Sequence, residues 1–153
     1  MRIRIAANAF DPHGEACAFA AGRTDIGAMV TFVGYCRDTT TGHAVTALHL
    51  EQYPGFTEQE IARFSQAICE QYDVTDALIV HRVGTMRPGE PIVLVAVLAT
   101  HRVAAFEASQ LLMDYLKTEA PLWKKESGPH GDRWIEPGIT DLERRDLAER
   151  KRA

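Results

Sequence analysis

One uninterrupted apolar run constrains the fold of this chain more than any other segment. Residues Ile92 to Ala99 read IVLVAVLA, and no polar side chain breaks the series. A strand with one solvated face would alternate apolar and polar residues, so this run favours a strand that is covered on both faces and lies centrally in a sheet. A second strand, Ala77–Val83, precedes it across the turn Arg87–Glu90. So short a connection favours an antiparallel pair.

Patterns in the first half of the chain predict further strands and a helix. Arg2–Ala6 predicts a strand, and Asp11-Pro12 begins a helix that Gly22 closes, because aspartate caps a helix and proline suits its first turn. Ala28–Gly34 is rich in β-branched and aromatic residues and predicts a well-buried strand. Val45–Glu51 resumes the strand pattern, so these two strands are expected to pair as a hairpin with a long loop.

The segment between those two strands, Tyr35–His43, is polar and has no hydrophobic period, so we expect a mobile loop. Beyond a turn at Pro54-Gly55, Thr57 and Glu60 form a predicted capping box. The helix that follows carries one apolar stripe with spacings of three and four residues, formed by Ile61, Phe64, Ile68 and Tyr72.

A second long helix is predicted from about Arg102 to Glu119, directly after the apolar strand. At 100° per residue, one broad arc of it contains Ala105, Phe106, Ala108, Leu112, Met113, Tyr115 and Leu116. The opposite side carries Glu107, Gln110, Asp114 and Thr118. Lys117 lies at the boundary, so its stem can be buried while its amine emerges at the edge of a groove. Pro121 disfavours helical geometry at Ala120 and should end the helix there.

Composition and charge exclude several classes of protein. The net charge of −4 over 153 residues supplies no global basic field for a nucleic acid, so any bound anion needs a local patch. No apolar run approaches the ~20 residues that span a bilayer. Cys17, Cys36 and Cys69 show no CxxC pair or Cys/His ligand spacing. This argues against a disulfide framework and a structural metal site, and favours a reducing cytoplasm.

The most informative polar segment runs from Leu111 to Trp134 and brings Lys117, Lys124 and Lys125 among large apolar residues. Lysine is costly to bury, so the cluster indicates an anion site or a reacting amine. The alternative is a solvated helix end, where cations meet the C-terminal dipole. If a turn folds Lys117 and Lys124 across one cavity, two ammonium groups ~4 Å apart repel by about 4 kcal/mol at an effective dielectric of ~20. Such repulsion makes one amine a usable base or nucleophile unless an anion sits between them.

Two other positions can bind an anion. His101-Arg102 lies where the apolar strand meets a helix N-terminus, whose N–H groups and dipole suit a phosphate; a solvated capping dipeptide is the alternative. Arg37 follows another strand beside the polar loop, although most loop arginines are simply solvated. Cys36 is a candidate for an activated thiol next to that cation, but no obvious base or resolving cysteine accompanies it.

Together these segments resemble the family of large, catalytic subunits of molybdopterin synthase. The resemblance runs from about Gly27 to Glu136 with order and spacing intact, through AMVTFVGYCRD, LHLEQYPGFTE, HRVGTMRPGE, ATHRVAAFEASQLLMDYLKTEAPLWKKE and GDRWIE. It implies an α+β chain with the α/β-hammerhead fold and an additional antiparallel β subdomain. Residues 1–136 would form a single catalytic domain. Residues 137–153 would form a charged C-terminal tail, either a frayed helix or a partner-dependent arm.

The resemblance also implies a sulfurtransferase of molybdenum cofactor biosynthesis. Sulfur would pass from the C-terminal Gly-Gly thiocarboxylate of a small ubiquitin-like partner subunit to cyclic pyranopterin monophosphate, making the dithiolene of molybdopterin. This chain would form a homodimer at the core of a cytoplasmic heterotetramer, without a cofactor, a metal, a nucleic acid or a membrane as partner. A non-catalytic binding module for a ubiquitin-like protein is the alternative.

The resemblance assigns a role to each candidate residue. The essential lysines of the family fall on Lys117, as a base or electrostatic stabiliser, and on Lys124, which would stabilise the anion that develops as sulfur attacks or leaves. Substrate-binding positions fall on Arg37, His101, Arg102, Lys125 and Glu126. No cysteine needs a role, because the sulfur arrives on the partner. Pro137-Gly138 stands where some relatives carry an arginine that reaches the site of the other protomer, and Arg133 or Arg144 could replace it only speculatively.

Overall fold

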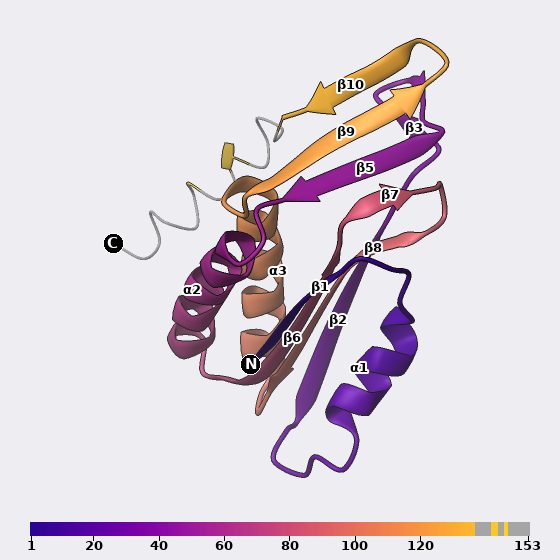
Figure 1. Ribbon diagram of the computed structural model, residues 1–153. Coiled ribbons are helices and arrows are strands. Elements are labelled where there is room, and N and C mark those ends of the chain that lie inside the picture. Colours follow the sequence, from indigo (N-terminus) through magenta and orange to yellow (C-terminus); the bar gives the residue numbers. More distant parts are fainter. Residues whose placement is uncertain (137–141, 144–145, 147–153) are drawn as a thin grey trace.

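The computed structural model describes residues 1–136, 142–143 and 146, and two sheets organise them (Figure 1). The main sheet has the spatial order β1-β6-β8-β2, with β1 at Arg2–Ala6, β6 at Val74–Arg82, β8 at Pro91–Ala99 and β2 at Ala28–Tyr35. The pair β1–β6 is parallel, and the other neighbours are antiparallel. The second sheet is antiparallel throughout in the order β10-β9-β5-β7, with β10 at Gly131–Ile135, β9 at Leu122–Gly128, β5 at Ala47–Gln52 and β7 at Gly84–Met86. The mixed architecture confirms the α+β prediction, and the second sheet matches the expected antiparallel subdomain.

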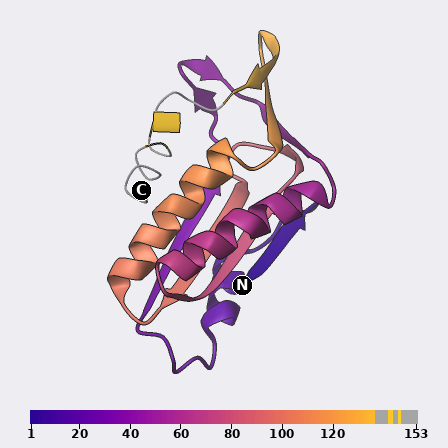
Figure 2. The same ribbon diagram turned by 90° about the vertical axis from the view of Figure 1, so that its left-hand side faces the viewer.

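Helices cover both faces of the main sheet. Figure 2 shows α2 (Phe56–Gln71) and α3 (Arg102–Thr118) side by side across one face, and α1 (Pro12–Ala20) lies against the other. The apolar run of β8 divides between them, because successive side chains of a strand point to opposite faces. Val93, Val95 and Val97 pack in the cluster under α2 and α3, and Leu94 and Leu98 pack in the cluster under α1. The predicted central, doubly covered strand is confirmed.

The strand at Ala28–Gly34 was expected to be well buried, and this prediction is wrong. β2 forms an edge of the main sheet, where Met29 is 42 % exposed and Phe32 41 % exposed. An edge strand has a neighbour on one side only, so the helices that cover the middle strands leave part of it open. The long-loop hairpin is also wrong, because β2 pairs with β8 while β5 pairs with β7 and β9 in the second sheet.

The polar segment Tyr35–His43 contains regular structure, which differs from the expected loop. β3 (Thr39–Thr40) and β4 (His43–Ala44) form a two-stranded hairpin. Its turn residues, Thr41 and Gly42, both have positive φ, at 49° and 80°. Such a pair of left-handed residues matches the twist of a tight hairpin, and the Thr-Gly dipeptide was the available sequence signal.

The start of α2 also differs from the prediction. Gly55, at a φ of 82°, caps the helix, and the Glu58 carboxylate accepts a hydrogen bond from its N–H at 2.8 Å, whereas Glu60 pairs with Arg63. Thr57 serves another purpose. Its hydroxyl accepts from the Tyr53 N–H at 3.0 Å and donates to the Pro121 carbonyl at 3.1 Å, which ties α2 to the connection between α3 and β9.

α3 spans nearly its predicted range and buries most of the predicted arc. Two side chains depart from it: Phe106 is 63 % exposed, and Asp114 is only 7 % exposed. Phe106 shares an outer stripe with Val103, Gln110, Met113 and Lys117, spaced by three and four residues. A helix buries the faces that meet the sheet and α2, and helical winding alone cannot say where those contacts begin and end.

His81 provides a test of the fold through pH. Its ring is buried in β6, and burial lowers its pKa to about 4, although the contact between Nδ1 and the Arg82 carbonyl at 3.0 Å acts the other way. Above pH 6.5 the ring is neutral in folded and unfolded chains. Between pH 6.5 and 4 only the unfolded chain gains the proton, so stability falls as the pH falls, by about 3 kcal/mol. Urea unfolding at pH 7.5 and pH 4.5 should show this loss in the wild type and a clearly smaller one in His81→Asn, which no longer titrates. Equal losses in the two proteins would contradict the assignment.

Candidate active site

Lys124 and Glu126 lie on the face of the second sheet that turns toward the main sheet. They are two residues apart on β9, so their side chains share a face, and Lys124 Nζ lies 3.0 Å from Glu126 Oε1. Their partners across β5 are Leu50 and Leu48, which belong to a buried cluster with Ile92 of the main sheet. The turn expected between Lys117 and Lys124 is the short connection before β9, and Lys124 itself is held on the strand.

The Glu126 carboxylate is a buried hub with three partners. Its side chain is 6 % exposed, and besides Lys124 it accepts from the Thr40 hydroxyl at 3.1 Å and from Arg133 Nη2 at 3.3 Å. Burial acts to raise the pKa of this carboxyl, but the contacts with Lys124, Thr40 and Arg133 outweigh burial and hold the pKa below its usual value. An ionised carboxylate at this depth fixes the Lys124 ammonium in one place. Glu126 is itself negatively charged, so it does not bind an anionic ligand directly.

Arg133 was considered only as a speculative substitute for the arginine of some relatives, and the structure brings it to Glu126. It lies directly opposite Glu126 on β10, and its side chain is 47 % exposed. The hairpin of β9 and β10 was not predicted, although Gly131, with a φ of 101°, marks its turn. Beside it is a hollow of about 330 Å³ lined by Glu126, Arg133 and the tips of two hairpins, including His43 and His130. Neither Lys117 nor Lys124 lines that hollow.

Arg37 approaches the same region from the end of β2. The preceding residue, Cys36, is pinned by two backbone hydrogen bonds to the Gly89–Glu90 turn, at 2.8 and 2.9 Å. The Cys36 thiol is buried, and burial raises its pKa although the nearby Lys124 ammonium acts to lower it. A buried thiol with a raised pKa is a poor nucleophile, which supports the interpretation without a role for Cys36.

Lys117 lies on the exposed side of the last turn of α3. Only the residues from Glu119 to Pro121 separate the end of α3 at Thr118 from the start of β9, and Figure 1 shows that end of α3 below β9. The Glu119 N–H donates to the Tyr115 carbonyl, which closes the helix before Pro121 as predicted. Lys117 and Lys124 therefore flank one short connection, which the Thr57 hydroxyl holds through Pro121.

His101 and Arg102 lie at the other end of α3. Both are exposed, and the His101 side chain does not cap the helix. Fifteen residues separate Arg102 from Lys117, which at 1.5 Å per residue is about 22 Å. Within one chain the structure therefore does not bring His101 and Arg102 together with the two lysines.

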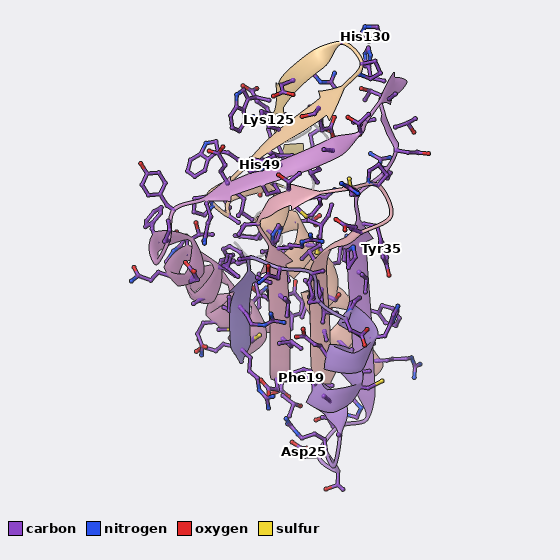
Figure 3. All side chains as sticks on the ribbon, turned by 45° about the vertical axis from the view of Figure 1, so that its right-hand side comes forward. Phe19, Asp25, Tyr35, His49, Lys125 and His130 are labelled. Carbon is purple, nitrogen blue, oxygen red and sulfur yellow. The ribbon has the colours of Figure 1, made fainter. Side chains whose placement is uncertain are left out.

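Lys125 is also set apart from Lys124. It points to the opposite face of the second sheet, where its Nζ lies 3.3 Å from Asp132 and 5.6 Å from the centre of the Trp134 ring. Figure 3 shows Lys125 and His49 on that sheet, and the two residues are direct cross-strand neighbours. Adjacent residues of a strand cannot reach the same small ligand from one face.

The arrangement is suited to anion chemistry. Lys124 and Arg133 converge on one carboxylate, so two cations face one fixed negative charge. Over residues 1–136 and the three described tail positions, no group of His, Cys, Asp and Glu residues could hold a metal ion. None of the described helices has the length and apolar character needed to cross a membrane.

Comparisons with known proteins agree with the geometry. The family model described as MoaE protein matches residues 5–119. A relative from Ralstonia nicotianae, named molybdopterin synthase catalytic subunit, is 47 % identical over 139 residues, which covers 91 % of this chain and 79 % of the relative. The equally named Escherichia coli protein is 44 % identical over 84 % of this chain and 85 % of its own length.

The fold also matches solved structures. A molybdopterin biosynthesis MoaE protein from Burkholderia ambifaria has a TM-score of 0.78 and 42 % identity, and covers 94 % of this chain and 96 % of its own. A Helicobacter pylori structure, a complex of subunits 1 and 2 of molybdopterin-converting factor, shares the fold at 19 % identity and a TM-score of 0.73, covering 87 % of this chain and 89 % of its own. The family model and the close relatives extend over most of the chain, and the chain belongs to the MoaE protein family.

Proposed function

We propose that this chain is the catalytic subunit of a molybdopterin synthase, an enzyme of molybdenum cofactor biosynthesis, and that it catalyses sulfur transfer. The donor is the C-terminal thiocarboxylate of a small ubiquitin-like partner, and the acceptor is cyclic pyranopterin monophosphate. The shared name of the 44–47 % identical relatives supports the enzyme class. Their description as a subunit, and the two-subunit Helicobacter pylori complex, motivate the small partner. We place the reaction in the cytoplasm, in keeping with the free cysteines.

The observation that carries this proposal is the Lys124–Glu126–Arg133 cluster. As the thiocarboxylate sulfur attacks a carbon of the pterin, a carbon–sulfur bond forms and a carbon–oxygen bond of the same carbon breaks, so negative charge develops on that oxygen. The Lys124 ammonium stabilises that charge without moving, because Glu126 already holds the ammonium in place at 3.0 Å. Lys117 supplies a second cation across the α3–β9 connection, as a base or electrostatic stabiliser. Water then breaks the bond between the sulfur and the partner's acyl carbon, which leaves the sulfur on the pterin and frees the partner as an ordinary carboxylate. Two such transfers produce the dithiolene.

The geometry changes two of the assigned substrate-binding roles. Glu126 suits a positioning role toward Lys124, because its oxygens are engaged by Lys124, Thr40 and Arg133. Arg133 takes its place as an anion-binding group beside Arg37. Lys125 faces away from Lys124, so we assign it no contact with the pterin.

His101 and Arg102 fit the proposal only if two copies of the chain share each site. The outer stripe of α3 and the exposed β2 edge carry apolar side chains, including Val103 at 59 %, Phe106 at 63 % and Phe32 at 41 % exposure. A two-fold axis across the middle of α3 would set the helix antiparallel to its copy. His101 and Arg102 of one protomer would then lie beside Lys117 of the other. The exposed apolar side chains of α3 and β2 therefore support a homodimer, in which the cyclic phosphate would be bound across the interface.

The experiment that tests the function is reconstitution. Purified protein is mixed with the thiocarboxylated partner and the cyclic pterin, and the pterin products are identified by mass spectrometry. We expect no product without the partner, and with it a dithiolene product that carries two sulfur atoms. Tight partner binding without any sulfur in the pterin would instead favour the non-catalytic binding module.

A further inference from the structure

The outer face of the second sheet, opposite Lys124, carries an aromatic hollow that sulfur transfer does not use. Glu51 pairs with Trp123 across β5 and β9, and Trp134 pairs with Lys125 across β10 and β9, so all four side chains point outward. A hollow of about 300 Å³ lies among them, lined by Glu51, Gln52, Tyr53, Trp123 and Trp134. His49 and Lys125, labelled in Figure 3, mark this face.

Three aromatic rings of the hollow are open to solvent. Tyr53 is 64 % exposed, Trp134 55 % and Trp123 45 %. Tyr53 and Trp123 meet edge to face, with ring centres 5.7 Å apart, so the two rings form a corner rather than a flat surface. Tyrosine and tryptophan exposed in this way are typical of the anchor points of protein interfaces.

The polar groups around the rings attract positive charge. The Glu51 carboxylate forms an ion pair with His49 at 3.5 Å, and no lysine or arginine nitrogen of the described residues lies within 4 Å of it. Aromatic faces and a carboxylate both favour a cationic group that donates hydrogen bonds.

The protein itself places one cation on this face. The Lys125 ammonium lies 5.6 Å from the centre of the Trp134 ring, and Asp132 balances its charge at 3.3 Å. Glu51 has no such lysine or arginine partner within 4 Å, so its carboxylate can accept hydrogen bonds from a second cation.

We propose that this hollow binds an arginine side chain of a protein partner. A guanidinium is planar, stacks on an indole ring and has several donors for the Glu51 carboxylate, whereas an ammonium is a point charge that is more strongly hydrated. Stacking of one cation on an exposed ring strengthens binding only about 2- to 30-fold, so the hollow works as one anchor within a larger protein interface. The proposal does not depend on sulfur transfer, because the hollow and Lys124 are on opposite faces.

The test uses the fact that Trp123 and Trp134 are the only tryptophans of the chain. Their two indole N–H signals in a nitrogen–proton correlation spectrum therefore report on the hollow alone. N-acetyl-arginine amide is titrated at constant ionic strength, beside N-acetyl-citrulline amide, which has nearly the same shape without the charge, and N-acetyl-lysine amide. We expect saturable shifts of both signals with the arginine probe at millimolar concentration, and binding at least three-fold weaker for the other two.

Two variants of the full-length chain complete the test. Glu51→Gln should weaken arginine binding at least three-fold, whereas Glu107→Gln, the same change at an exposed position on α3, should leave it unchanged. If the citrulline probe bound as tightly as the arginine probe, the charge would not contribute to binding, and the proposal would be overturned. Equal binding of lysine, or an unchanged Glu51→Gln, would overturn the guanidinium assignment. Sulfur transfer is measured on the same two variants as a separate readout. We expect both variants to keep the wild-type rate.

Discussion

Replacing Lys124 with alanine is expected to lower the rate of sulfur transfer about 100- to 1000-fold, the usual effect of removing a preorganised group that stabilises developing charge. The Lys124 ammonium is half-buried and held at 3.0 Å by Glu126, so no solvent cation can take its place with the same geometry. Formation of the sulfur-containing pterin in a single turnover, followed by mass spectrometry, measures the loss. Lys124→Gln, which keeps a hydrogen-bond donor for Glu126 without the charge, should lose activity to a similar extent.

Lys125→Ala is the matched comparison for that result. It removes the same kind of side chain from the next position of β9, on the opposite face of the sheet. We expect a loss at least ten-fold smaller than that of Lys124→Ala. Circular dichroism and thermal unfolding of the three variants verify that each one is folded. If the two alanine variants lose activity equally, Lys125 contacts the substrate as the family resemblance implied, and the role derived from the strand geometry is wrong.

Mixing two inactive variants is expected to restore activity. Lys117→Ala and the double variant His101→Ala/Arg102→Ala should each be nearly inactive alone. If each site takes Lys117 from one protomer and His101-Arg102 from the other, half of the randomly mixed dimers contain both variants, and each of these has one intact site of two. Activity should return to about one quarter of the wild-type value. Co-expression with two different affinity tags, or refolding of the mixed chains, produces the mixed dimers.

The matched control for this experiment is a mixture of Lys117→Ala with Lys124→Ala. Both lysines flank one connection in the same chain, so every site in every mixed dimer lacks one of them and no activity should return. No recovery with the first mixture, in the presence of demonstrated mixed dimers, would show that His101 and Arg102 do not complete the site across an interface.

The sequence predicted those parts of the fold that depend on local patterns. The run at Ile92–Ala99 identified the central strand, because only a doubly covered strand is apolar at every position. Asp11-Pro12 and Pro121 marked helix boundaries that the structure confirms, since capping and the loss of a backbone donor act within one turn. Gly55 at positive φ displaced the expected capping box to Glu58, a backbone choice that residue patterns at Thr57 and Glu60 do not reveal.

The same limits apply to the candidate site. The sequence singled out the lysines and arginines as chemical groups, and the family resemblance gave them roles. It could not separate the roles of Lys124 and Lys125. The two side chains face opposite sides of the second sheet only because β9 is a strand that pairs with β10 and β5. For the same reason the contact of Arg133 with Glu126 was not predicted, since it arises only through the register of that pairing.

The sequence by itself determined which residues form the covered core strand, where the long helices end, and which family the chain resembles, because these follow from residue type and spacing along the chain. Only the tertiary structure decided that β2 is an exposed edge and that Glu126 gathers Lys124, Arg133 and Thr40. Those outcomes depend on strand order and strand register, which bring residues together without regard to their distance in the sequence.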